Sequence, residues 1–206
     1  MAIAINGSTN VITGISVGGL PDGIVDADML ASNAVTSAKL ASGVGGKVLQ
    51  FDSVTKTDTS SVTTNATPQD ISGLSITLSN VLSTSKIYIT GKVQMSLQYA
   101  TTGNIHINVN GTEQGTAPSS YSRPVAHTGT GYLGVGQQYG CYAMAFDLEV
   151  DSSTSVVAGS NTIKLQMSQP DTTSGHTLYI NRSQTDPNGV AGPRYVSTLS
   201  VFEIAP

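Results

Sequence analysis

A regular alternation of apolar and polar side chains is the feature that most constrains the fold of this chain. It is longest between Lys86 and Tyr99, where the odd-numbered residues are apolar apart from Gly91, and the even-numbered ones are polar apart from Tyr88. Because successive side chains of a β-strand point to opposite faces, this pattern predicts one long strand with a buried face and a solvated face.

The same alternation recurs along the chain and predicts about eight strands. They cover residues 48–55, 74–78, 86–99, 105–109, 142–150, 163–167, 177–180 and 195–204. The connections carry tight-turn residues, such as Asn110-Gly111 and Pro187-Asn188-Gly189. Antiparallel strands with one dry and one wet face predict an all-β fold, a two-sheet antiparallel β-sandwich of jelly-roll type.

Composition excludes several classes of function. Only 11% of the residues are Asp, Glu, Lys or Arg and the net charge is −4, whereas globular chains average about 25% charged residues. Phosphate binding needs a concentrated basic patch, so we expect no nucleic acid partner. No apolar run approaches the roughly 20 residues of a membrane span, and no secretion signal is visible, so we expect no membrane insertion and synthesis in a cytoplasm.

Two parts are expected, because residues 1–46 differ in composition from residues 47–206. The first part is rich in Gly, Ala and Ser, and contains one possible short helix, capped by Asp26 or Asp28, with a narrow stripe at Leu30, Ala34 and Leu40. Two leucines contribute about 1.5–3 kcal/mol each, which does not offset the entropy cost of ordering some fifteen residues. We therefore expect a 1–46 attachment and trimerisation segment that another chain covers, and a 47–206 sandwich knob.

Residues 112–138 show no sustained alternation and predict one long loop. Long loops on compact domains are usually functional or disordered. The candidate receptor-binding residues in it are Tyr121, Arg123, His127 and Tyr132, since Tyr offers stacking area and Arg offers forked donors. A flexible loop without a ligand is the alternative.

No constellation of catalytic residues stands out. Asp147, Glu149 and Asp151 share a strand face, but a glycosidase also needs a walled cleft and a carboxyl group of raised pKa, so a solvated strand end is expected. Residues 129–134 match a dinucleotide-binding glycine pattern, but a strand rather than a helix follows them. We therefore expect no enzymatic activity, no catalytic residue and no cofactor.

The histidines and the cysteine also have structural interpretations. His106, His127 and His176 lack the close spacing of a structural zinc pair, so no metal is expected, and His106 lies on the polar face of its strand, where solvation is the default. Cys141 is the single cysteine. It is expected to be a small core residue, and the chain can form no internal disulfide.

Residues 10–50 resemble a known family of viral proteins. The stretch from Ile12 to Gln50, with the core Asn33-Ala-Val-Thr-Ser-Ala-Lys-Leu40, is similar to the N-terminal region of small tail-fibre and virion structural proteins of tailed bacteriophages, notably those of cyanobacteria and marine bacteria. The core resembles a module that many phage fibres repeat. Here it occurs once, which is typical of short fibres or small accessory pieces, and residues 51–206 resemble no family that we can name.

The resemblance implies a homotrimer whose N-terminal segment docks on other virion proteins of the tail or baseplate. The knob would then bind a host-surface molecule, a glycan or a protein, and the protein would reside in the virion after assembly in the bacterial cytoplasm. The alternative is a purely structural virion component, such as a capsid decoration or baseplate connector, without a receptor role.

Overall fold

The computed structural model describes residues 4–6, 11–13, 34–35, 39, 47–98, 102–118, 125–130, 140–170, 176–190 and 192–206. The chain divides into two compact units, Met1–Gly46 and Lys47–Pro206. Among the described residues there is no helix long and apolar enough to cross a membrane.

In the first unit, β1 (Ala4–Asn6) pairs antiparallel with β2 (Val11–Thr13). The helix predicted through Ala34 is not formed there: Ala34 lies in a bend, and the Lys39 ammonium donates a hydrogen bond to the Ala34 carbonyl at 2.8 Å. A stripe this rich in alanine buries too little apolar surface to hold a short helix in a single chain. The other two stripe residues, Leu30 and Leu40, lie outside the described residues.

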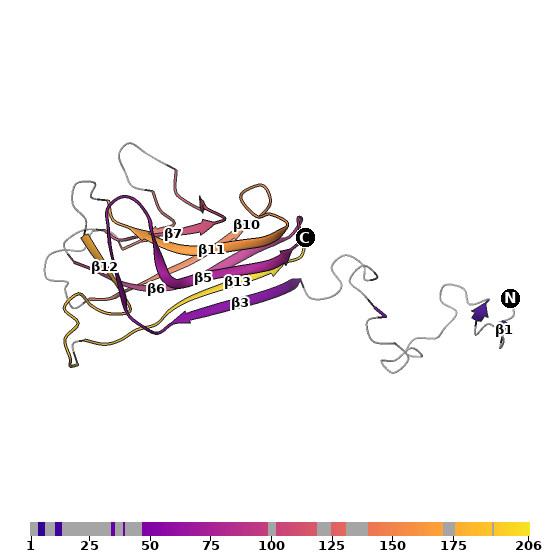
Figure 1. The fold of residues 1–206 in the computed structure, drawn as a ribbon, viewed down its shortest axis with the longest axis horizontal. Coiled ribbons are helices and arrows are strands. Elements are labelled where there is room, and N and C mark those ends of the chain that lie inside the picture. The colour runs from indigo at the N-terminus through magenta and orange to yellow at the C-terminus, as the bar shows by residue number, and fades with distance from the viewer. Residues whose placement is uncertain are drawn as a thin grey trace. The chain divides into compact units, whose positions relative to one another are not determined.

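The second unit is a β-sandwich of two antiparallel sheets (Figure 1). The six-stranded sheet contains β3 (Val48–Lys56), β13 (Ser197–Ile204), β6 (Lys86–Leu97), β12 (His176–Ile180) and β4 (Ser60–Thr64) in that order, with β10 (Tyr142–Val150) also paired with β6. The five-stranded sheet contains β5 (Gln69–Val81), β11 (Gly159–Ser168), β7 (Asn104–Val109) and β8 (Thr112–Gln114), with β9 (Thr128–Gly129) also paired with β7. The predicted all-β sandwich is confirmed.

The alternating residues form one core between the sheets. Ile87, Ile89 and Val93 of β6 are fully buried, as are Ile105 and Ile107 of β7 in the facing sheet. Each such side chain contributes about 1.5–3 kcal/mol when it leaves water. The period of two in the sequence is therefore the signature of this buried face.

Gly91 interrupts the apolar series of β6 for a steric reason. A Cβ atom there would lie 2.1 Å from the Thr198 carbonyl oxygen and 2.8 Å from the Phe146 ring. Phe146 lies directly opposite Gly91 on β10 and fills the space that a larger residue would need. Only glycine allows β13 and Phe146 to approach β6 this closely.

The two ends of the sandwich differ in what they carry. Lys47, where the unit begins, lies beside the C-terminus, because the Ala205 amide donates to the Lys47 carbonyl at 2.6 Å. We call this the proximal end; it also carries the turns at 82–85, 110–111 and 151–158. The strand directions place the turns at 57–59 and 65–68 and the chain between β12 and β13 at the opposite, distal end, where β12 lies in Figure 1.

Residues 112–138 are not one structureless loop. Asn110 and Gly111 both have positive φ, at 53° and 89°, which is the backbone of a type I′ hairpin turn. The turn folds β8 onto β7, and β9 pairs with the remainder of the same edge. Strands of three and two residues are too short to show alternation, so the pattern missed them.

Asn181 joins several strands at the distal side of the six-stranded sheet. It is fully buried with φ 61°. Its amide nitrogen donates to the carbonyls of Lys56 and Asp58 at 2.8 and 2.9 Å, and its amide oxygen accepts from the Ser197 hydroxyl at 2.7 Å. Its backbone N–H donates to Gln94 of β6 at 2.9 Å. One side chain thus links the β3–β4 turn to the start of β13.

Asn181→Ala should lower the free energy of unfolding by about 2–4 kcal/mol, because two buried and one part-buried hydrogen-bonding group lose their partner and alanine disfavours positive φ. Asn80→Ala is the matched control, since Asn80 has φ 59° at an exposed position. Urea unfolding of both variants measures the difference. Equal losses would show that only the backbone conformation matters at Asn181.

Candidate functional site

Of the four residues predicted to bind a receptor, the structure describes His127. Tyr121, Arg123 and Tyr132 lie outside the described residues. The His127 backbone N–H donates to Ile105 at 3.0 Å, and its ring nitrogen Nδ1 lies 3.1 Å from the Gly115 carbonyl oxygen. His127 therefore fixes the chain against the edge of the five-stranded sheet, with its ring half-buried.

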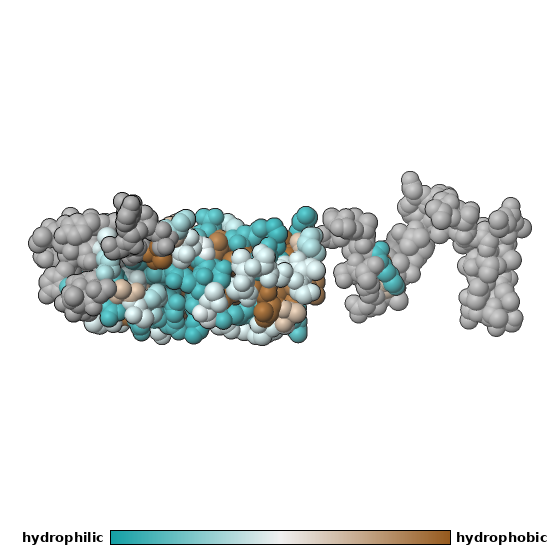
Figure 2. Space-filling model, turned by 90° about the horizontal axis from the view of Figure 1, so that it is seen from above, coloured by the Kyte–Doolittle hydropathy of each residue, from teal (hydrophilic) through white to brown (hydrophobic). Residues whose placement is uncertain are grey.

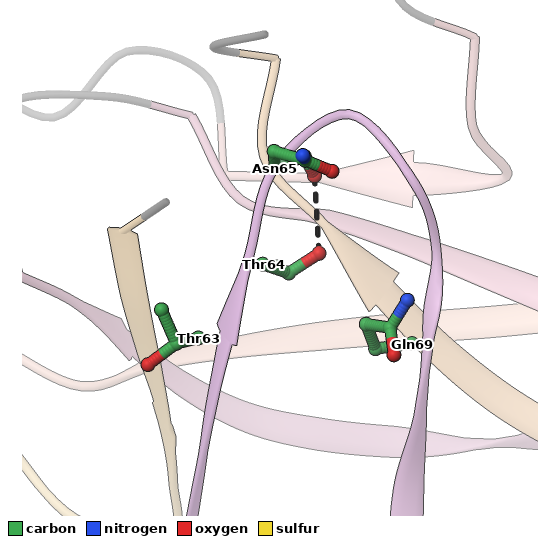
Figure 3. A pocket seen from close by; sticks show the side chains of 4 residues that line it. All are labelled: Thr63, Thr64, Asn65 and Gln69. Carbon is green, nitrogen blue, oxygen red and sulfur yellow. Dashed lines mark hydrogen bonds between the residues drawn. The ribbon is translucent and has the colours of Figure 1, made fainter. Parts of the chain in front are cut away.

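A polar pocket of about 320 Å³ lies at the distal end, where β4 turns into β5. Thr63, Thr64, Asn65 and Gln69 line it. Figure 3 shows the Thr64 hydroxyl and the Gln69 amide reaching into the gap between the two strands, with Asn65 above them. Sequence analysis did not single out this pocket, because Thr, Asn and Gln are common throughout the chain.

Side-chain hydrogen bonds hold the turn beside this pocket in one conformation. The Thr64 hydroxyl lies 2.7 Å from the Thr67 carbonyl, and the Asn65 amide oxygen accepts from the Thr67 backbone N–H at 3.0 Å. Gln169, which is fully buried, donates from its backbone to Asn65 and from its side chain to the Thr64 carbonyl, at 3.1 and 3.2 Å. The described lining is fixed by these hydrogen bonds and carries no charged side chain, and it offers hydroxyl and amide groups to a polar ligand.

His106 is buried, so the prediction of a solvated histidine is wrong. Its ring lies between the Ser168 hydroxyl, 2.7 Å from Nε2, and the Glu113 carboxylate, which contacts Nδ1. The sequence pattern could not show this burial, because it arises when β8 folds back and places Glu113 beside β7. The three side chains join β8, β7 and β11 across the face of the five-stranded sheet that points away from the core.

The Ser168–His106–Glu113 connectivity is that of an acyl-transfer triad. A reacting carbonyl group must also reach the serine oxygen. Ser168 is 2% exposed and His106 3% exposed. In this conformation the cluster therefore acts as a buried link between strands.

Two of the three carboxylates singled out by the sequence, Glu149 and Asp151, have ordinary partners. Glu149 accepts from Lys86 at 2.6 Å, and this hydrogen bond raises the pKa of Lys86. A hydrogen bond from the Ser153 hydroxyl lowers the pKa of Asp151, opposite to what a general acid needs. Within the described ranges, no group of three or more His, Cys, Asp or Glu side chains could hold a metal ion.

Comparison with known proteins identifies no family. No protein-family model matches the chain, and no curated protein matches it. Solved structures of infectious bursal disease virus have low similarity to this chain. The structure of the Gt strain has 13% identity and a TM-score of 0.36, and the match covers 76% of this chain and 38% of that one. The structure of the virus-derived T=1 particles has 15% identity and a TM-score of 0.37, and the match covers 77% of this chain and 41% of that one. This chain spans less than half of those proteins. TM-scores this low support no conclusion about function.

Cys141 is half-buried just before β10, and burial raises the pKa of its thiol to about 11. At pH 8 roughly one molecule in a thousand then carries the thiolate, which is the reactive form. We expect the native protein to react with Ellman's reagent far more slowly than the urea-unfolded chain. Equal rates would show that the thiol is open to solvent.

Proposed function

We propose that this protein is a short tail-fibre protein of a tailed bacteriophage, with its N-terminal unit on the virion and its sandwich directed at the host. The observation that carries the proposal is the separation of the two ends of the sandwich. The N-terminal unit joins at Lys47 on the proximal end, whereas the polar pocket lies on the distal end. The resemblance of residues 10–50 to phage fibre proteins agrees with this polarity.

The sandwich is suited to hold these ends apart. Its longest strand, β5, has 13 residues, which corresponds to about 40 Å at 3.3 Å per residue. Nine- to twelve-residue strands run beside it in both sheets, so the unit is a stiff spacer. A binding pocket at its distal end would be presented away from the point of attachment.

Exposed apolar side chains near the proximal end support association with other protein chains. Val48, Leu49, Phe51, Leu82 and Val157 are each 44–55% exposed, and all lie toward this end. In Figure 2, where most of the sandwich surface is hydrophilic, hydrophobic residues are prominent near the end at which the C-terminus lies. Such clusters favour contacts with protein. We assign this end to contacts with further copies in a homotrimer and with virion proteins.

A purely structural virion component is the second candidate, and an aromatic row favours it. Phe202 lies directly opposite Phe51 on β3 and Tyr88 on β6, with ring centroids 4.7 and 6.4 Å away. The row lies on the outer face of the six-stranded sheet, and Phe51 is 55% exposed. A capsid decoration or baseplate connector would bury this row against a neighbouring protein.

Light scattering on the full-length protein tests the fibre proposal. We expect a mass of about three chains, because the exposed apolar side chains at the proximal end favour contacts with further copies of the chain. A monomer at micromolar concentration would contradict the trimer. It would favour the connector.

Replacing Asn65 and Gln69 together with alanine should weaken binding to host cells about five- to a hundredfold, since each lost hydrogen bond contributes about 0.5–1.5 kcal/mol. Ser79→Ala, on the same strand near the proximal end, is the matched control. Flow cytometry with labelled full-length protein gives the measurement. If the pocket variant binds normally and Tyr121→Ala with Arg123→Ala does not, the loop is the receptor site.

A further inference from the structure

A second polar depression lies on the outer face of the five-stranded sheet. It has a volume of about 480 Å³. Strands β5, β7 and β11 and the β7–β8 turn form it, and its lining residues are Asp70, Asn108, Asn110, Gly111, Thr162, Lys164 and Gln166. These residues offer carboxylate, ammonium, amide and hydroxyl groups and no apolar side chain, so the ligand must be polar.

A bulge brings Asp70 into this depression. The ladder between β11 and β5 shifts register between Lys164 and Gln166, so that Lys164 faces Ser75 but Gln166 faces Asp70. Bulges re-aim side chains next to functional sites. The Asp70 carboxylate accepts from the Lys164 ammonium at 2.9 Å and from the Gln166 amide at 2.7 Å.

The charges of the Asp70 carboxylate and the Lys164 ammonium balance each other. The hydrogen bond from Lys164, followed by that from Gln166, holds the pKa of Asp70 below its usual value. Asp70 is therefore ionised at neutral pH and paired with one ammonium group. A neutral pair offers no excess positive charge to a phosphate chain, so an uncharged polar ligand fits better than nucleic acid.

The wall at the β7–β8 turn is rigid before any ligand binds. The Asn110 amide donates to the Ser155 carbonyl and to the Asn161 side chain, both at 2.9 Å, and accepts from the Thr162 backbone N–H at 2.9 Å. The Asn108 amide oxygen accepts from the Gly111 backbone N–H at 2.9 Å. A site whose side chains are already fixed loses little conformational entropy on binding.

Several hydrogen-bonding groups keep unused capacity after these contacts. In the part of the chain that the structure describes, Lys164 donates one of its three ammonium hydrogens, and the Asn108 N–H₂ group and the Gln166 amide oxygen have no partner. Donors and acceptors with unused capacity therefore lie on neighbouring strands, and neighbouring strands are about 5 Å apart. Sugar hydroxyls both donate and accept, and they can use both kinds of group.

We propose that Asp70, Asn108, Lys164 and Gln166 form a binding site for an uncharged saccharide on the flank of the sandwich. The proposal rests on the proposed function, in which the sandwich recognises a host glycan, and it adds a second contact apart from the distal pocket. The described lining holds no aromatic ring for stacking, so each site binds weakly, with a dissociation constant on the order of millimolar. Several copies in one fibre would raise the overall affinity by avidity.

The test uses the full-length protein and a printed array of bacterial polysaccharides, followed by saturation-transfer NMR with an oligosaccharide from a polysaccharide that binds. Asn108→Ala and Gln166→Ala should each lower the affinity about three- to tenfold. Ser160→Ala is the matched control, because Ser160 is exposed on the same strand outside the depression. Gln166→Ala and Ser160→Ala should keep the wild-type melting temperature, since they alter half-buried or exposed side chains, whereas Asn108→Ala should lower it slightly, because the Gly111 backbone N–H loses its acceptor.

The outcomes separate this site from the proposed function. Saccharide binding by the wild type that both variants retain in full would overturn the flank site while leaving glycan recognition by the protein intact. Wild-type protein that binds host cells but no saccharide, on the array or at millimolar concentration, would also overturn the site and would indicate a protein receptor. Loss of saccharide binding in Asn108→Ala and Gln166→Ala, but not in Ser160→Ala, supports the flank site.

Discussion

The buried amide of Asn181 is the polar contact on which the six-stranded sheet depends. Strand β6 is paired along both edges, and Met95 faces Tyr142 on one side and Ile180 on the other. Beyond this pair β12 ends, and β13 pairs with the next part of β6. Asn181 adopts the left-handed backbone conformation that ends β12, and its side chain binds Ser197 at the start of β13. Without it, buried backbone groups at the junction would lose their partners, at a cost of about 1–3 kcal/mol each.

The outer face of the five-stranded sheet is held together by polar contacts rather than by apolar packing. His106 lies between Ser168 and Glu113, and two residues further along β7, Asn108 lines the depression that contains Asp70. A solvated strand face would need none of these links. Their presence gives this face a defined shape, as recognition of a polar ligand requires.

The two ends of the sandwich suit opposite tasks. Five exposed apolar side chains lie near the point where the N-terminal unit joins, and the polar pocket occupies the other end, where Val190 and Val196 are the exposed apolar side chains. Apolar surface favours permanent protein contacts, whereas hydroxyl and amide groups favour a polar ligand that is bound reversibly. This division supports a fibre, and the aromatic row around Phe202 is the feature that a connector would use instead.

The sequence by itself determined the all-β class and the buried faces of β6, β7, β10 and β11, because alternation is a local property of each strand. It did not reveal β8 and β9, which are too short to alternate, and it wrongly predicted a helix at Ala34 and a solvated His106. Only the tertiary structure decided which polar side chains meet. Asp70 and Lys164 are 94 residues apart, and Asn181 contacts Lys56 across 125. Such partners are set by strand order and by the register shift between Lys164 and Gln166, and neither leaves a periodic trace in the sequence.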